Sequence, residues 1–183
     1  MYRKINKGEL MANKFIFADP KKCIGCLNCE LACAAKHMNI SFEEAYDLAL
    51  NGEVELIHRN TVIEMNGLTA PMQCMQCEDA PCVEACPIDI IRYENNYVKI
   101  YESDCIGCRS CAMVCPFGAI TMAKSNSTNV TGLVAIKCDL CGGEEGKQAC
   151  VNICPTDAIE LIDYNEYKRR KQENAFERLH QDA

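Results

Sequence analysis

Four cysteines at residues 105–115 are spaced for iron–sulfur chemistry. They stand in the run Cys105-Ile-Gly-Cys108-Arg-Ser-Cys111-Ala-Met-Val-Cys115-Pro116, which is C-x2-C-x2-C-x3-C-P. In proteins this spacing binds 4Fe–4S clusters, because three cysteines on a tight loop ligate one cluster and the fourth reaches a second. We therefore expect this run to supply ligands to two clusters, whose chemistry is one-electron transfer.

Three further groups of four account for the remaining cysteines, sixteen in all in a chain of 183 residues. Group I (23–33) has the same spacing as the run above, which is group III, but lacks the proline. Group II (74–86) has two extra residues before its third cysteine, and group IV (138–154) has a longer insertion in its middle. Zinc sites use C-x2-C pairs roughly a dozen or more residues apart, which fits less well. Four 4Fe–4S clusters are therefore the expected cofactors.

The composition restricts the other classes of function. The formal charge of −7 disfavours nucleic acid or an anionic membrane surface as a partner. The N-terminus shows neither an apolar signal segment nor a twin-arginine pair, and no stretch approaches the ~20 apolar residues of a transmembrane helix. We therefore expect a cytoplasmic protein without a transmembrane segment, whose cysteines bind metal instead of forming disulfides.

An internal repeat connects groups II, III and IV. Each group ends in a cysteine–proline pair that leads into an apolar segment, in the copies Cys86-Pro-Ile-Asp-Ile-Ile91, Cys115-Pro-Phe-Gly-Ala-Ile120 and Cys154-Pro-Thr-Asp-Ala-Ile159. We expect each copy to turn from a cluster into a strand. Strands are also expected before the cysteine loops, at 14–18, 97–101 and 133–137.

The cysteine-free segment 34–70 reads as an insertion. Its Ser41-Phe-Glu-Glu44 is a capping box that should begin a helix, which Asn51-Gly52 should end. Strands are expected at 54–57 and 61–65, closed by Asn66-Gly67, so that the insertion contains a helix and a hairpin.

The four groups and their spacings resemble the four-cluster iron–sulfur subunits of molybdenum or tungsten oxidoreductases. Relatives of this kind include the beta subunits of formate dehydrogenases and the small subunits of formate hydrogenlyase. The resemblance covers about residues 13–163 and includes Phe15-Ile-Phe-Ala-Asp-Pro20 and Ala70-Pro71. It implies an α+β fold, a double bacterial-ferredoxin-like fold whose two units of two 4Fe–4S clusters are related by a pseudo-twofold axis, with a small inserted helix and hairpin. The implied segments are an N-terminal extension (1–12), an outer ferredoxin unit (13–33 plus 133–163), the insertion (34–70), an inner ferredoxin unit (71–123) and a C-terminal helical tail (164–183).

The resemblance also implies which cysteines share a cluster. In such subunits the last cysteine of each group ligates the neighbouring cluster. The implied ligands are Cys23, Cys26, Cys29 and Cys154 for cluster 1; Cys33, Cys138, Cys141 and Cys150 for cluster 2; Cys74, Cys77, Cys82 and Cys115 for cluster 3; and Cys86, Cys105, Cys108 and Cys111 for cluster 4.

In function, the resemblance implies an electron-transfer subunit that is no enzyme by itself, and no catalytic residue is identified in the sequence. The implied partners are a molybdenum or tungsten formate dehydrogenase-type catalytic subunit, an iron hydrogenase subunit, or both, with a second ferredoxin-like subunit as a further candidate. Such an assembly would be a cytoplasmic hydrogen-dependent carbon dioxide reductase or a formate hydrogenlyase-type complex. Two alternatives stay open: a free soluble polyferredoxin shuttle, and an assembly or maturation factor.

Charged residues near the cysteines allow a plain and a functional interpretation. His37, His58 and His180 are not needed as ligands, so we expect them to be packing or surface residues. Arg109 and Lys137 lie beside cysteine ligands, where a cation either raises the reduction potential of a cluster or is merely solvated.

Glycine and bulky apolar residues also surround the loops. We expect Gly25 and Gly107 where the backbone passes close to a cluster. The expected core that shields the clusters from water consists of Tyr93, Tyr97, Tyr101, Phe117, Met72, Met75, Met113 and Met122.

Overall fold

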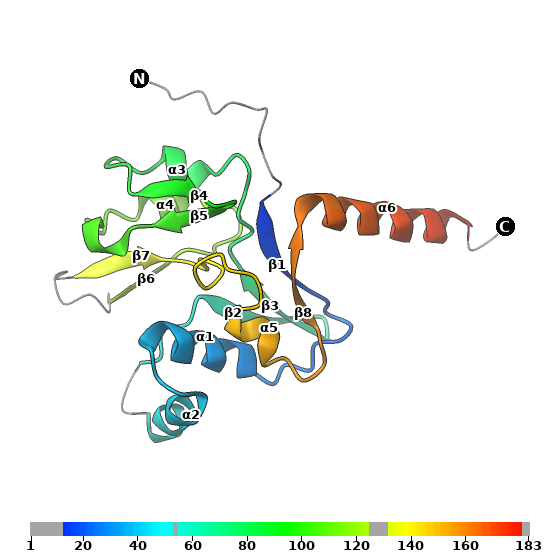
Figure 1. Ribbon diagram of the computed structural model, residues 1–183, viewed down its shortest axis with the longest axis horizontal. Coiled ribbons are helices and arrows are strands. Elements are labelled where there is room, and N and C mark those ends of the chain that lie inside the picture. The colour runs from blue at the N-terminus through cyan, green and yellow to red at the C-terminus, as the bar shows by residue number, and fades with distance from the viewer. Residues whose placement is uncertain (1–12, 53–54, 125–131, 181–183) are drawn as a thin grey trace.

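The computed structural model describes residues 13–52, 55–124 and 132–180. The expected N-terminal extension, 1–12, lies outside the described residues. Within them the fold is mixed α and β: short helices and four separate two-stranded antiparallel sheets surround the cysteine loops (Figure 1). The elements in chain order are β1 (Lys14–Ala18), α1 (Asn28–Met38), α2 (Phe42–Asn51), β2 (Asn60–Met65), β3 (Leu68–Gln73), α3 (Pro81–Glu84), β4 (Ile91–Glu94), β5 (Tyr97–Ile100), the 3-10 turn η1 (Glu102–Asp104), α4 (Ser110–Val114), β6 (Thr121–Lys124), β7 (Leu133–Ile136), α5 (Ala149–Asn152), β8 (Ile159–Asp163) and α6 (Tyr164–His180).

The strands predicted before and after the cysteine loops are confirmed. β1, β5 and β7 precede groups I, III and IV, and β4, β6 and β8 follow the three cysteine–proline copies. β1 pairs with β8, so that Phe15 lies opposite Ile162 and the first and last strands of the described chain are joined. β4 pairs with β5, and β6 pairs with β7. The cysteine loops are therefore attached at both ends to short, paired strands.

The predicted hairpin in the insertion is wrong in one strand. Residues 55–57 form no strand, and residues 53–54 lie outside the described residues. Instead β2 pairs with β3 across Asn66-Gly67, whose φ angles of 53° and 75° define the turn that joins tight hairpins. The predicted turn at Asn66-Gly67 is confirmed, but the strand that pairs with β2 is β3, which follows the turn. Pro71 in β3 weakens the strand pattern there, and it is tolerated because each strand of a two-stranded sheet has a free edge.

The helices around the insertion follow from their caps. Ser41 accepts a hydrogen bond from the Glu44 backbone N–H at 3.0 Å and begins α2, as its capping box predicts. Gly52 ends α2 with a φ of 66°. α1 spans 11 residues and contains both Cys29 and Cys33 of group I. It packs against both α2 and α5.

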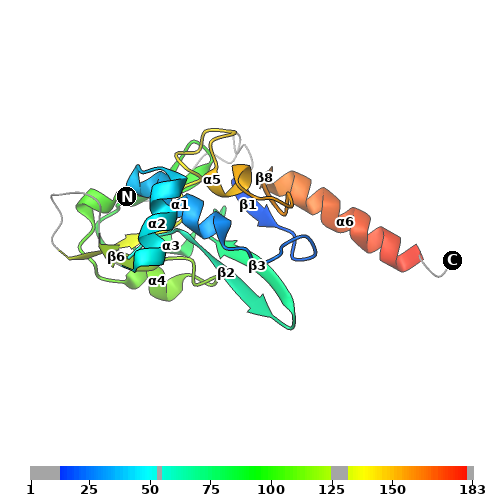
Figure 2. The ribbon, with the colours of Figure 1, turned by 90° about the horizontal axis from the view of Figure 1, so that it is seen from below.

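The C-terminal tail is a 17-residue helix, α6, which projects from the rest of the protein (Figures 1 and 2). Near its start, Tyr167 packs its ring on Phe15 and Phe17 of β1, with centroid distances of 5.5 and 5.8 Å. Beyond this contact Phe176 and Leu179 are exposed. The predicted polar helix is therefore present and is held by its first turns.

Candidate iron–sulfur sites

The sixteen cysteines surround four cavities of similar size, with four cysteines at each. The empty volume of each cavity is about 310 to 340 Å³, which includes the space at its opening to solvent. We number them after the expected clusters: cavity 1 is lined by Cys23, Cys26, Cys29 and Cys154; cavity 2 by Cys33, Cys138, Cys141 and Cys150; cavity 3 by Cys74, Cys77, Cys82 and Cys115; and cavity 4 by Cys86, Cys105, Cys108 and Cys111. The structure thus brings together the same sets that the resemblance implies.

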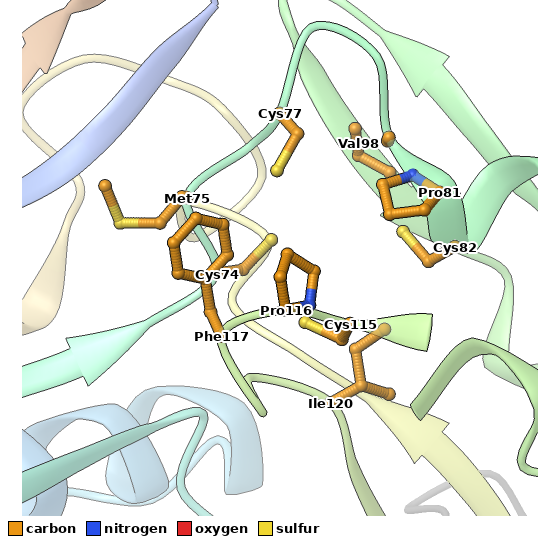
Figure 3. A pocket seen from close by; sticks show the side chains of 11 residues that line it. Cys74, Met75, Cys77, Pro81, Cys82, Val98, Cys115, Pro116, Phe117 and Ile120 are labelled. Carbon is orange, nitrogen blue, oxygen red and sulfur yellow. The ribbon is translucent and has the colours of Figure 1, made fainter. Parts of the chain in front are cut away.

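Cavity 3 shows how such a site is built (Figure 3). The sulfurs of its four cysteines face a common space, and Pro81, Val98 and Ile120 line it with Met75 and Phe117. Three of the cysteines come from group II and the fourth, Cys115, comes from the end of group III. An apolar wall around four convergent thiols suits a cluster that must be shielded from water.

In each cysteine loop the residue directly before the second cysteine has the left-handed conformation. The φ angles there lie between 49° and 71°, at Gly25, Gln76, Gly107 and Leu140. Such turns aim successive backbone N–H groups into the loop and create a concavity for anions. The N–H groups of Gln76 and Gly107 lie 3.5 and 3.4 Å from the sulfurs of Cys74 and Cys105. The loops are therefore shaped to stabilise negatively charged sulfur.

The three cysteine–proline copies share one conformation. Asp89, Gly118 and Asp157 occupy the same place in each copy and have φ angles of 54°, 59° and 49°. In two copies the next backbone N–H donates to the cysteine sulfur, at 3.4 Å for Cys115 and 3.3 Å for Cys154. The repeat seen in the sequence is therefore a repeated turn that also supplies hydrogen bonds to a ligand.

Burial makes several of these thiols hard to ionise without a compensating cation. It raises the pKa of Cys29 and Cys150 to about 12, and that of Cys82 to about 11. Iron binds the thiolate, so coordination must displace these protons. At the exposed Cys108, hydrogen bonds from Ser110 lower the thiol pKa. All sixteen cysteines are free of disulfides. The donor set, the apolar walls and the inward N–H groups fit 4Fe–4S clusters.

Short helices connect the cavities in pairs. α1 carries Cys29 of cavity 1 and Cys33 of cavity 2 one turn apart, and it packs against α5, which carries Cys150. In the same way α3 and α4 pack together and carry Cys82 of cavity 3 and Cys111 of cavity 4. Cavities 1 and 2 are thus neighbours, and so are cavities 3 and 4.

Gln76 and Lys137 lie between the two pairs. The Gln76 amide, in the loop of cavity 3, donates from Nε2 to the carbonyl of Cys138 of cavity 2 at 2.8 Å. Lys137 is 2% exposed, and its Nζ donates to the carbonyl oxygens of Val98 and Cys138 and to Gln76 Oε1. No carboxylate of a described residue forms an ion pair with it. A buried cation therefore lies between the cysteine loop of cavity 3 and Cys138 of cavity 2.

A network of charged side chains lies beside cavity 2, and the sequence did not predict it. His37 donates from Nδ1 to the Cys33 carbonyl at 2.8 Å and pairs through Nε2 with Asp139 at 3.0 Å. Burial lowers the pKa of His37, but the hydrogen bonds to Asp139 and Cys33 together outweigh burial and raise that pKa to about 9. Arg59 also contacts Asp139, at 3.4 Å, and Glu102 at 2.7 Å. His37 is thus a packing residue in an ion-pair network, which no local sequence pattern reveals.

The other expectations have mixed outcomes. Gly107 has no room for a side chain, but the obstacle is the Leu133 carbonyl, 2.6 Å from the site of a Cβ atom. Arg109 is exposed, and its side chain forms no hydrogen bond or ion pair with the described residues. Tyr97 is buried as expected, whereas Met113 is 86% exposed and does not belong to the core.

Together the short paired strands and the four cysteine-lined cavities define a polyferredoxin-type protein. A family model described as "4Fe-4S binding domain" matches residues 98–121. An iron–sulfur protein of Rhodospirillum rubrum is 44% identical over 168 residues, which cover 85% of each chain. Electron transport protein HydN of Escherichia coli is 35% identical over 170 residues, 88% of this chain and 94% of HydN. Formate hydrogenlyase subunit 2 of Escherichia coli is 31% identical over 195 aligned positions, 90% of each chain.

The chain therefore belongs to the family of 4Fe–4S electron-transport proteins that includes HydN and formate hydrogenlyase subunit 2. Within the described part of the chain, no helix is both long and apolar enough to span a membrane.

Proposed function

We propose that this protein conducts electrons through four 4Fe–4S clusters, one in each cavity, and performs no substrate chemistry itself. Each bound cluster would accept and release one electron at a time. The ligands would be the four cysteines that line each cavity, with the last cysteine of every group serving the neighbouring site. The observation that carries the proposal is the partition of all sixteen cysteines into four sets of four around cavities of similar size.

The same partition supports a double-ferredoxin arrangement. Cavities 1 and 2 are built on the packed pair α1 and α5, and cavities 3 and 4 on the packed pair α3 and α4. Gln76 and Lys137 join cavity 2 to cavity 3. This order, 1–2–3–4, makes one continuous path with cavities 1 and 4 at its ends.

The two ends of this path carry matched surface features. Cys26 in cavity 1 and Cys108 in cavity 4 are the only two of the sixteen cysteines that are exposed. Beside them, Ile24 and Ile106 occupy equivalent loop positions, and each is 65% exposed. An exposed ligand with an apolar rim suits a surface at which an electron enters or leaves in a protein complex.

We propose that the partners at these ends are subunits of a cytoplasmic oxidoreductase complex. A molybdenum or tungsten formate dehydrogenase-type subunit and an iron hydrogenase subunit are the favoured pair, which corresponds to a formate hydrogenlyase or carbon dioxide reductase type of assembly. The support is the similarity along 90% of the chain to a protein named formate hydrogenlyase subunit 2. The unpaired cysteines support a reducing compartment.

The first test is anaerobic native purification with iron, molybdenum and tungsten analysis. We expect about sixteen irons per chain, four for each cluster, migrating with a molybdenum or tungsten protein in fixed stoichiometry. Sixteen irons on a lone monomer would identify a soluble shuttle instead. An assembly factor would leave electron flux unchanged when it is removed from the finished complex, and zinc in place of iron would refute electron transfer altogether.

A further inference from the structure

Three amide side chains line cavity 2. Among them only Asn60 has an amide group that donates no hydrogen bond to a described residue. Asn60, Gln73 and Gln148 are 5%, 5% and 2% exposed. Gln148 donates from Nε2 to the carbonyls of Leu140 at 3.1 Å and Glu144 at 2.6 Å. Gln73 donates from Nε2 to the carbonyl of Ile16 at 2.8 Å. Neither polar atom of the Asn60 side chain has a partner among the described residues, and both are shut off from solvent.

The position of Asn60 in the fold explains why it faces the cavity. Asn60 is the first residue of β2 and lies directly opposite Gln73, the last residue of β3. Both side chains line cavity 2, so the open end of this hairpin closes the wall of the site. The preceding residue, Arg59, already donates its backbone N–H to the sulfur of Cys33 at 3.2 Å. The start of β2 is therefore aimed at the cysteine ligands of this cavity.

A buried amide without a partner is unfavourable, and native proteins rarely leave one. The Asn60 Nδ2 group has two hydrogens. The Oε1 of Gln73, opposite in the sheet, is also without a partner, so it accepts neither of them. Neither hydrogen therefore has an acceptor among the described residues, and the Asn60 side chain lines cavity 2. A sulfur atom of a cluster in this cavity would be the missing acceptor.

We propose that Asn60 donates a hydrogen bond from its side-chain amide to the cluster bound in cavity 2. This hydrogen bond raises the reduction potential of that cluster. The proposal rests on the proposed ligand set of cavity 2. Hydrogen bonds to cluster sulfur favour the reduced form, which carries one more negative charge. The charged groups beside the cavity are largely paired with each other, His37 with Asp139 and Arg59 with Glu102.

The test is an EPR-monitored redox titration of the complete, iron-loaded protein. The wild type is measured first: fewer than about sixteen irons or fewer than four one-electron steps would reject the ligand assignment and not the role of Asn60. Cys141→Ser changes a ligand of cavity 2 alone and marks the step that belongs to this site. Asn60→Leu keeps the size of the side chain and removes its N–H groups. Thr61→Val is the control, because its side chain points to the opposite face of β2 and is exposed.

We expect Asn60→Leu to lower the potential of the marked step by an amount that weakens reduction about tenfold, which equals 59 mV for a one-electron couple. Thr61→Val should leave all four steps in place. An unchanged titration of Asn60→Leu with full iron content would overturn the proposal, and so would a shift in a different step. If Asn60→Leu binds too little iron to titrate, Asn60→Asp decides. This variant keeps the shape and replaces the donor with a carboxylate, so an unchanged potential would overturn the proposal. A lowering of the marked step that persists at a pH where the carboxyl group is protonated and uncharged would support it.

Discussion

Arg59 lies in a segment without regular structure, yet replacing it should destabilise the protein strongly. Its guanidinium donates to the Lys137 carbonyl at 3.2 Å and to Glu102 at 2.7 Å, and it lies 3.4 Å from Asp139. It thereby joins the cysteine-free insertion to the residues that precede groups III and IV. The Arg59 side chain is only 14% exposed. Arg59→Met would remove all three contacts and leave Glu102 without its partner.

The size of the effect follows from these contacts. A hydrogen bond to a charged group contributes about 1.5–3 kcal/mol and one to a carbonyl about 1 kcal/mol. Glu102 and Asp139 are 22% and 27% exposed, so water replaces part of what they lose. We therefore expect a net loss of about 2–3 kcal/mol in the free energy of unfolding. In a chain of this size that loss lowers the melting temperature by roughly 4–12 °C.

The measurement is anaerobic thermal melting of the iron-loaded protein at one fixed scan rate, because unfolding with loss of clusters is not reversible. Lys168→Met is the control: it removes an exposed cation of α6 whose side chain has no partner in the described structure, and it should not shift the transition. In the background of Glu102→Gln, Arg59→Met should cost less than it does alone. A loss no larger than that of the control, or one fully additive with Glu102→Gln, would refute the reasoning.

Three further substitutions test the loops. Gly107→Ala should reduce thermal stability and iron retention, because its Cβ would lie 2.6 Å from the Leu133 carbonyl; melting that matches the wild type would contradict this. Gly118→Asp should be nearly neutral in the same melting assay, because aspartates hold the same left-handed conformation at the equivalent place in the other two cysteine–proline turns and nothing lies within 4 Å. Cys154→Ser and Cys26→Ser should alter the same EPR step although 128 residues separate them in the sequence, since both line cavity 1; changes in two different steps would reject the shared site.

The cysteine loops, their flanking strands and the family were predictable because their signals are local. Ligand spacing in C-x2-C-x2-C is fixed within one loop, and the cysteine–proline repeat marks each strand that follows. The α2 helix was equally local, since Ser41 and Glu44 form its cap three residues apart. Where a turn and its ligands lie within a dozen residues, the sequence pattern and the structure agree.

The network beside cavity 2 was not predictable, because its partners are far apart in the chain. His37 and Asp139 are separated by 102 residues, and Arg59 and Glu102 by 43. None of these four residues belongs to a recurring motif, and a histidine beside a complete set of cysteine ligands gives no signal of its own. The same holds for Asn60, whose role depends on the absence of a partner and not on the identity of its neighbours in sequence. The β3 strand was missed for the opposite reason, since Pro71 is a local signal that favours a non-strand conformation.

The pairing of the strands implies that the inner unit cannot stand alone as 71–123, although this segment carries all eight cysteines of cavities 3 and 4. β3 takes its partner from β2, and β6 takes its partner from β7, and both partners lie outside the segment. A fragment of 71–123 would therefore expose one free strand edge on each side and lose the start of β3. A fragment of 58–137 would contain both complete hairpins. We expect the fragment 58–137 to bind about eight irons after anaerobic reconstitution and to retain them in the presence of a chelator. The fragment 71–123 should lose its iron under the same conditions. Equal retention by the shorter fragment would show that β3 and β6 can complete the unit without β2 and β7.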